Sequence, residues 1–263
     1  MTPLQTIDAD FSASVTCFKD RVFLVTGATG SVGRVAALVL AKHGATVILH
    51  GRRQAKLDEL YDEFEALGYP KPANIFLDLL KATEADYLDL AETIFATFKR
   101  LDGIFHAAGH MTPLAPLALQ DLNSWQAHLM LNIAAPVAIT RVCLPMLKRA
   151  VNARVIFLSE SHVVNPTAYW GAFLVSKASL SNIAKIWNME VANDSTLRFG
   201  VLLPGPIASQ MRAMSHPGEH FSELPPLDSI APAVLYMMLS DALSASVETL
   251  PAYFQLHPAA GIP

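Results

Sequence analysis

Short apolar runs alternate along the chain with longer amphipathic runs. Six continuous apolar runs have strand length, and such runs are typical of strands that are buried on both faces; they lie at 22–26, 46–50, 74–77, 103–106, 154–158 and 197–203. The segments between them carry apolar residues at helical spacing, over 33–42, 54–67, 84–99, 122–149 and 172–193. The pattern also predicts a bend near Pro136, a helix near 229–239 and a last strand at 252–256.

Strands that are separated by helices pair in parallel, with helices on both faces of the sheet. The sequence therefore predicts an α/β fold, a doubly wound parallel sheet of Rossmann type. We expect a single domain over 21–263, preceded by an N-terminal extension over 1–20. In such a sheet, ligands bind at the carboxyl ends of the strands.

Composition narrows the class of protein. Of 263 residues, 52% are apolar and only 16% are charged, whereas globular domains carry about 25% charged residues. This composition excludes a disordered chain, and buried parallel strands account for much of the apolar excess. The net charge of −4 lacks the basic surface that a nucleic-acid-binding protein needs, so no nucleic-acid partner is expected.

The apolar excess also raises the question of a membrane. The best candidate span, 133–147, is short and is interrupted by Arg141 and two prolines, so we expect a buried helix and no membrane span. The first ten residues lack the basic start and apolar core of a signal peptide. Cys17 and Cys143 form neither a disulfide framework nor a metal cluster, which favours a reduced cytoplasmic protein without a metal site.

A glycine-rich segment, TGATGSVG over 26–33, connects the first predicted strand to the first predicted helix. Glycines allow backbone N–H groups to approach a pyrophosphate, and a helix N-terminus favours its negative charge. The alternative is a turn that only joins the two elements. The position favours a dinucleotide site, with these candidate residues: Thr26, Gly27, Thr29, Gly30, Ser31, Val32 and Gly33.

The end of the second predicted strand indicates which dinucleotide binds. A site specific for NAD places an acidic residue there for the ribose hydroxyls, but this chain has Arg52 and Arg53, with Arg34 as a third candidate cation. Arginine binds phosphate through paired hydrogen bonds, so we expect NADP(H) rather than NAD(H), the alternative being two surface arginines. Asp78 follows the third predicted strand, where it could meet the adenine amino group or cap a turn.

From Val22 to about Ala208 the chain resembles the short-chain dehydrogenase/reductase family, in its shorter, single-domain branch. Its motifs recur in order: the glycine segment, HAAG over 106–109, Asn132, Ser176-Lys177 and PGPIAS over 204–209. The resemblance implies that the last segment lies over the nicotinamide and that Lys177 bonds to its ribose. It adds these cofactor-binding candidates: Ala108, Gly109, Lys177, Pro204, Gly205 and Ile207.

The catalytic positions depart from the family pattern, which is Asn, Ser, Tyr and Lys. Asn132 and Lys177 are retained, but Phe173 stands at the tyrosine position, four residues before the lysine. The family's serine lies about thirteen residues before the tyrosine, which here is Glu160, expected to pair with Lys177 or another cation. In the glycine segment, Ser31 replaces the usual middle glycine.

Three functions are compatible with these residues. The first is an NADP(H)-binding member whose carbonyl or alcohol chemistry is weak or lost, acting as a sensor or interaction protein. The second is an active oxidoreductase on a small carbonyl or alcohol, with a substitute acid: Tyr169, Glu160 or His162, with Ser161 and His110 as weaker candidates. The third, a fold without cofactor, is disfavoured by the glycines and arginines. We favour the first for the standard reaction.

Two further regions carry expectations. Helices 122–149 and 172–193 are apolar around most of their circumference, which predicts a partner subunit. By resemblance, these helices would form a homodimer or homotetramer. The segment 211–227 is expected to form a lid of mixed polarity over the substrate.

Overall fold

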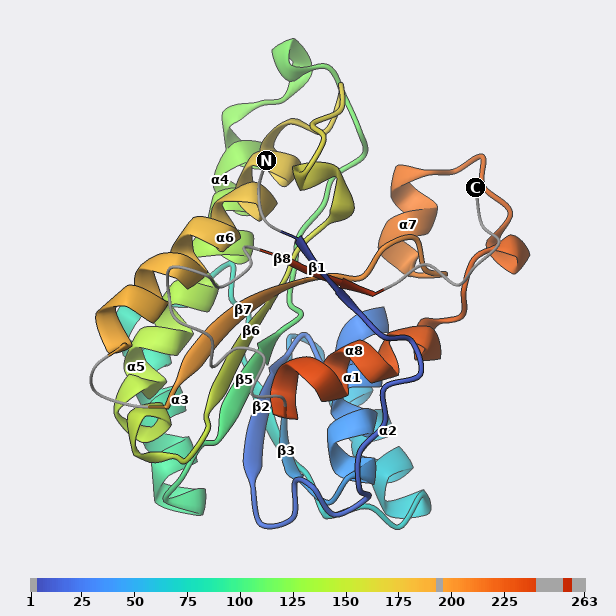
Figure 1. Ribbon diagram of the computed structural model, residues 1–263. Coiled ribbons are helices and arrows are strands. Elements are labelled where there is room, and N and C mark those ends of the chain that lie inside the picture. Colours follow the sequence, from blue (N-terminus) through green and yellow to red (C-terminus); the bar gives the residue numbers. More distant parts are fainter. Residues whose placement is uncertain (1–3, 193–195, 240–252, 257–263) are drawn as a thin grey trace.

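The computed structural model describes residues 4–192, 196–239 and 253–256. Within this part of the chain, eight parallel strands form one sheet in the order β1-β8-β7-β6-β5-β2-β3-β4 (Figure 1). The predicted doubly wound sheet is confirmed. Its strands are β1 (Leu4–Ile7), β2 (Val22–Thr26), β3 (Thr46–Gly51), β4 (Ala73–Phe76), β5 (Gly103–His106), β6 (Arg154–Leu158), β7 (Arg198–Leu203) and β8 (Tyr253–Leu256).

Helices cover both faces of the sheet and enclose two apolar cores (Figure 1). One face carries α1 (Ser31–Lys42), α2 (Gln54–Ala66) and α8 (Ala231–Leu239). The other carries α3 (Glu84–Phe98), α5 (Ala135–Arg149) and α6 (Gly171–Val191). Successive residues of a strand point to opposite faces, so Val25 lies in the first core and Leu24 in the second. This explains the unbroken apolar runs.

Strand β1 lies within the predicted N-terminal extension, and the sequence analysis did not predict it. It pairs in parallel with β8, with Leu4 opposite Tyr253 and Ile7 opposite Leu256. Ile7 and Phe18 are buried in the first core. The segment therefore belongs to the folded unit. Its four residues, LQTI, contain no continuous apolar run, so the pattern that identified the other strands could not detect it.

The predicted helix over 122–149 consists of α4 (Leu122–Leu129), a π-helical turn η2 (Met130–Ala134) and α5. The wide turn immediately precedes Pro136, which has no N–H to donate to the carbonyl of residue 132. This helix of 28 residues is long and apolar enough to cross a membrane by length and composition, because an 18-residue stretch within it has a mean hydropathy of 1.6. The candidate span 133–147, which was expected to be too short, is thus part of a longer helix. Length and composition alone are weak evidence, because this helix packs on α3 and α6.

Short elements occupy the loops at the carboxyl ends of the strands. They include α7 (Gln210–Ser215), which lies inside the predicted lid segment. The others are 3-10 turns: η1 (Leu117–Leu119), η3 (Ser161–Val163), η4 (Phe221–Glu223) and η5 (Leu227–Ile230). These loops and turns surround the cleft described next.

Candidate active site

The loop between β2 and α1 packs so tightly that one position in the loop and one in the first turn of α1 admit only glycine. Gly27 has a φ of 64°, and a Cβ there would lie 2.7 Å from the Cα of Ala108. A Cβ on Gly33 would lie 2.1 Å from the carbonyl oxygen of Gly27. These contacts bring α1 directly against the loop, so that its first N–H groups open towards the sheet edge, as an anion site requires.

His50, at the end of β3, forms a hydrogen bond to this loop. It was not among the residues predicted from the sequence. Its Nδ1 accepts a hydrogen bond from the N–H of Gly27 at 3.4 Å, and its Nε2 lies 3.1 Å from the carbonyl oxygen of Leu77. Burial lowers the pKa of His50 to about 4, so the ring is neutral at pH 7, with a donor and an acceptor nitrogen. The sequence feature that could have indicated this role is a histidine at the end of a buried strand, in the segment TVILH.

A cleft of about 380 Å³ crosses the carboxyl ends of the strands. It brings together most of the cofactor-binding residues that were predicted from the sequence. Thr26 and Lys177 do not line it; Thr26 is buried and its Oγ1 accepts from the N–H of Ala108 at 3.3 Å. The predicted residues that line the cleft are Gly27, Thr29, Gly30, Ser31, Val32, Gly33, Arg52, Arg53, Asp78, Ala108, Gly109, Pro204, Gly205 and Ile207.

The arginines divide into two groups. Arg52 and Arg53 are exposed at the rim of the cleft, and neither forms an ion pair with any residue that the structure describes. Arg34 faces a separate small hollow, where its Nε donates to Glu63 Oε2 at 3.0 Å. Arg34 as a third cofactor cation was therefore wrong, because helix α1 turns it towards α2. Asp78 lines the cleft and also caps a turn, accepting from the N–H of Leu80 at 3.2 Å.

Asn132 lies in the π-helical turn η2 and holds the loop after β5 in place. Its Oδ1 accepts from the N–H of His110 at 2.8 Å. Its Nδ2 donates to the carbonyl of His110 at 3.0 Å and to Ser176 Oγ at 2.9 Å. The buried amide thus joins η2, the loop after β5 and helix α6, and it does not itself line the cleft.

Lys177 projects from α6 towards the end of β6. Its Nζ donates to the carbonyl oxygen of Leu158 at 2.9 Å, while Ser159 Oγ donates to the carbonyl of Lys177 at 3.0 Å. Burial lowers the pKa of Lys177 to about 8, and the charge of Glu160 partly opposes that shift. A Cβ on Gly109 would lie 3.4 Å from this Nζ, so the lysine sits directly behind the glycine that lines the cleft.

Phe173, at the position that the resemblance assigns to the family's tyrosine, presents a hydrocarbon ring without a hydroxyl group. It is 3% exposed and packs in a small apolar cluster with Met111, Trp170 and Leu174. The ammonium of Lys177 lies 5.9 Å from the centre of its ring. No proton can be donated from this position.

Glu160 lines the cleft, and its carboxylate contacts residues of the turn that follows β6. Its Oε1 accepts from the N–H of Ser161 at 2.9 Å and lies 2.9 Å from His162 Nδ1. Glu160 thus contacts His162 and not Lys177, with which it forms no ion pair in the described part of the chain. The Ser161 hydroxyl is buried and has no hydrogen-bond partner among the described residues.

Tyr169 does not reach the site. It precedes the first residue of α6, has a φ of 75°, is 58% exposed and does not line the cleft. The helical spacing that would bring it near Phe173 therefore does not apply. This structure does not support Tyr169 as a substitute acid.

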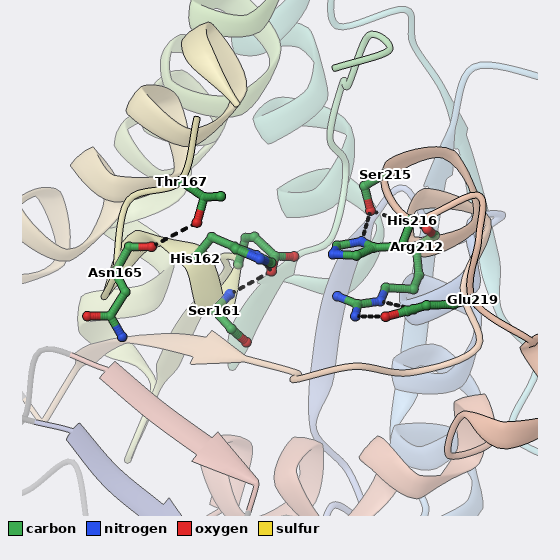
Figure 2. Close-up of polar contacts among 9 residues, drawn as sticks. Ser161, His162, Asn165, Thr167, Arg212, Ser215, His216 and Glu219 are labelled. Atoms are coloured by element: carbon green, nitrogen blue, oxygen red, sulfur yellow. Dashed lines mark hydrogen bonds and ion pairs between the residues drawn. The ribbon is translucent and has the colours of Figure 1, made fainter. Parts of the chain in front are cut away.

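Helix α7 and the residues after it face the turn after β6 across the mouth of the cleft. Figure 2 shows His162 and Ser161 opposite His216, Arg212 and Ser215. The rings of His162 and His216 are 5.5 Å apart, and His162 stacks on Trp170 at 4.2 Å. Arg212 Nε donates to Glu219 Oε2 at 2.7 Å. The predicted lid segment thus contacts the opposite wall through aromatic rings.

The comparisons with known proteins agree with this geometry. The model of the short chain dehydrogenase family matches residues 21–220. The chain belongs to the short-chain dehydrogenase/reductase family. The oxidoreductase YciK of Escherichia coli, itself uncharacterised, is 33% identical over 223 residues, which cover 85% of this chain and 88% of YciK.

Solved structures show the same family fold. A structure from Pseudomonas syringae, described as a short chain dehydrogenase, is 34% identical and superposes with a TM-score of 0.88, covering 94% of this chain and 98% of its own. One from Shigella flexneri, complexed with NADP, is 31% identical with a TM-score of 0.85, covering 92% and 99%. The family binds nicotinamide cofactors.

Proposed function

We propose that this family member binds NADP(H) in preference to NAD(H), and that its standard carbonyl or alcohol chemistry is weak or lost. Two facts support the cofactor preference: Arg52 and Arg53 line the cleft without acidic partners among the described residues, and a similar structure holds NADP. The tight approach at Gly27 and Gly33 supports a pyrophosphate on the loop. When bound, the cofactor supplies a hydride.

Fluorescence titration with NADPH and NADH tests the preference. NADPH should bind more tightly than NADH. Arg52→Ala should lower the affinity for NADPH by about tenfold or more and change the affinity for NADH little, because a charge-assisted phosphate contact contributes about 1.5–3 kcal/mol. Arg34→Ala is the matched control, since Arg34 is bound to Glu63 outside the cleft. Absence of NADPH binding at high micromolar concentration would contradict the proposal.

Phe173 is the observation that carries the loss of standard chemistry. Hydride addition to a carbonyl builds negative charge on the oxygen, and a proton donor must meet that charge. General acid catalysis contributes about 10²–10⁴ in rate. With Phe173 buried at this position and Tyr169 outside the cleft, neither aromatic residue supplies the proton. The protein would then serve as a cofactor-dependent sensor or interaction protein.

A second candidate function is an active reductase in which Glu160 and His162 supply the proton. The contact of 2.9 Å between His162 Nδ1 and Glu160 Oε1, beside the cleft, favours it over other substitutes. Turnover of a carbonyl panel by the wild type, abolished in His162→Asn and retained in Tyr169→Phe, would support this second function. Turnover that survives in His162→Asn would exclude it.

We further propose a homodimer or homotetramer formed through α4, α5 and α6. Large apolar side chains on these helices are exposed, at 40% for Leu129, 53% for Ile186 and 67% for Met189. Exposed apolar patches on a folded chain are typical of interfaces. The predicted interface helix 172–193 ends at a residue that lies outside the described part of the chain.

We also propose a cytoplasmic location for the protein.

A further inference from the structure

The charged residues that line the cleft fall into two sets. In the described part of the chain they are Arg52, Arg53, Asp78, Glu160 and Arg212. The first three follow β3 and β4, while Glu160 follows β6, three strands away in the sheet. With strands about 4.8 Å apart, the two sets are separated by roughly 14 Å. A dinucleotide on the loop after β2 therefore places its phosphate end near the arginines and leaves Glu160 for the substrate.

Glu160 carries an available negative charge. Both hydrogen bonds that it accepts go to Oε1, and no described residue donates to Oε2. The other charged group in this half of the cleft, Arg212, is already neutralised by Glu219. Lys177 directs its ammonium to the carbonyl of Leu158.

Large apolar side chains line this half of the cleft, together with the polar His110, Ser159, Gln210 and Ser215. The apolar side chains come from the loop after β5, the start of α6 and helix α7, and they are Met111, Trp170, Met211 and Met214. Phe173 lies behind them in the same cluster as Met111 and Trp170. The chamber therefore combines one carboxylate with thioether and aromatic surfaces, which accommodate an apolar body. The negative charge that builds on a reacting carbonyl oxygen would find no hydroxyl at Phe173 and a like charge at Glu160.

We propose that this chamber binds an iminium ion with an apolar body, and that Glu160 binds its positive charge. The inference rests on the proposed cofactor binding and names the substrate class of the same site. Hydride addition to a protonated or alkylated C=N⁺ bond discharges a cation and builds no negative charge. A proton donor at Phe173 is then unnecessary, and the carboxylate of Glu160 stabilises the bound cation.

The step balances without an acid when the nitrogen bears an alkyl group. A reduced nicotinamide gives a hydride, with its electron pair, to the iminium carbon and forms the new C–H bond. The π pair of the C=N⁺ bond becomes the lone pair of a neutral tertiary amine. The nicotinamide is oxidised by two electrons, and no proton moves.

Binding can be measured without turnover by calorimetry on the complex with oxidised NADP⁺. The probe is N-methyl-dihydroisoquinolinium, which is permanently charged, and methyl-dihydronaphthalene is its neutral counterpart of matching shape. The cation should bind about tenfold or more tightly than the neutral compound. Glu160→Gln should lower only the affinity for the cation, by about 10- to 100-fold, which corresponds to the loss of a contact to a charged group. Glu223→Gln, an exposed carboxylate in η4 that does not line the cleft, should change neither.

Turnover with NADPH separates this inference from a substitute acid. The wild type should reduce the iminium well above the uncatalysed rate and reduce tetralone, the matching ketone, far more slowly. Phe173→Tyr should raise the tetralone rate far more than the iminium rate, because only the ketone needs a proton. Equal affinity for cation and neutral compound, or full cation binding in Glu160→Gln, would overturn the inference. Failure of NADPH to bind would overturn the proposed function instead, and cation binding to the cofactor-free protein would still test Glu160.

Discussion

Gly33 is under a stronger steric constraint than Gly27. Gly33→Ala would place a Cβ 2.1 Å from the carbonyl oxygen of Gly27, so α1 or the loop must move. We expect a loss of about 1–3 kcal/mol in the free energy of unfolding and at least about tenfold weaker NADPH binding. Gly218→Ala is the control, because nothing lies within 4 Å of its added Cβ. Denaturant unfolding and NADPH titration of both variants measure the effect, and equal behaviour would contradict the assigned role of the loop.

Single residues were predictable where their type and spacing define the chemistry. The three glycines and Arg52 lie in the cleft because they directly follow strands, whose ends face one edge of the sheet. Arg34 was misplaced, since its position on helix α1 depends on the turn of the helix and on Glu63. His50 was missed because a buried histidine shows its role only through partners from two other strands.

At the scale of elements, the π-helical turn η2 fixes the loop after β5 through Asn132. Asn132→Asp keeps the acceptor for the N–H of His110 but removes both hydrogen bonds that Nδ2 donates. The buried Ser176 Oγ and the part-buried carbonyl of His110 lose their donor and a buried charge is introduced, so we expect about 2–5 kcal/mol lower free energy of unfolding. Asn123→Asp, an exposed substitution in the first turn of α4, should be neutral or slightly stabilising. Urea unfolding measures the free energy of unfolding of both variants. An Asn132→Asp variant as stable as the wild type would contradict the role of Asn132 in fixing the loop after β5.

Most elements could be predicted because buried parallel strands and amphipathic helices have different apolar periods. The exceptions have physical reasons. Strand β1 is a four-residue edge strand whose partner β8 lies far along the chain. The π-helical turn has no distinct apolar period, so the sequence analysis attributed the irregularity to Pro136 alone.

At the scale of the whole molecule, two buried histidines make folded stability depend on pH. Burial lowers the pKa of His50 to about 4 and that of His106 to about 3, from an ordinary value of 6.5. The unfolded chain therefore binds protons first as the pH falls below about 6.5, and stability is lost progressively towards pH 4. Each histidine contributes a slope of about 1.4 kcal/mol per pH unit.

Urea unfolding across this range measures that slope. In His106→Gln the slope between about pH 6.5 and pH 4.5 should fall by about one proton relative to the wild type. The comparison removes the contribution of the carboxylates, which both proteins share. An unchanged slope would show that His106 titrates normally in the folded protein.

Assembly also belongs to the whole molecule. If α6 lies in a subunit interface, the double substitution Ile186→Arg and Met189→Arg should reduce the mass measured by light scattering to that of a monomer, because buried charges disfavour association. Leu67→Arg, an equally exposed position at the end of α2 on the opposite face of the sheet, should leave the mass unchanged. A monomeric wild type at micromolar concentration would refute the proposed assembly.

The central claim is an intact cofactor site beside a missing proton donor. The most direct measurement compares NADPH-dependent reduction of tetralone by the wild type and by Phe173→Tyr, at cofactor saturation established by titration. The account predicts equal NADPH affinity for both proteins and a rate about 10²–10⁴ higher in Phe173→Tyr. Rapid wild-type reduction of the ketone that the substitution leaves unchanged would contradict it.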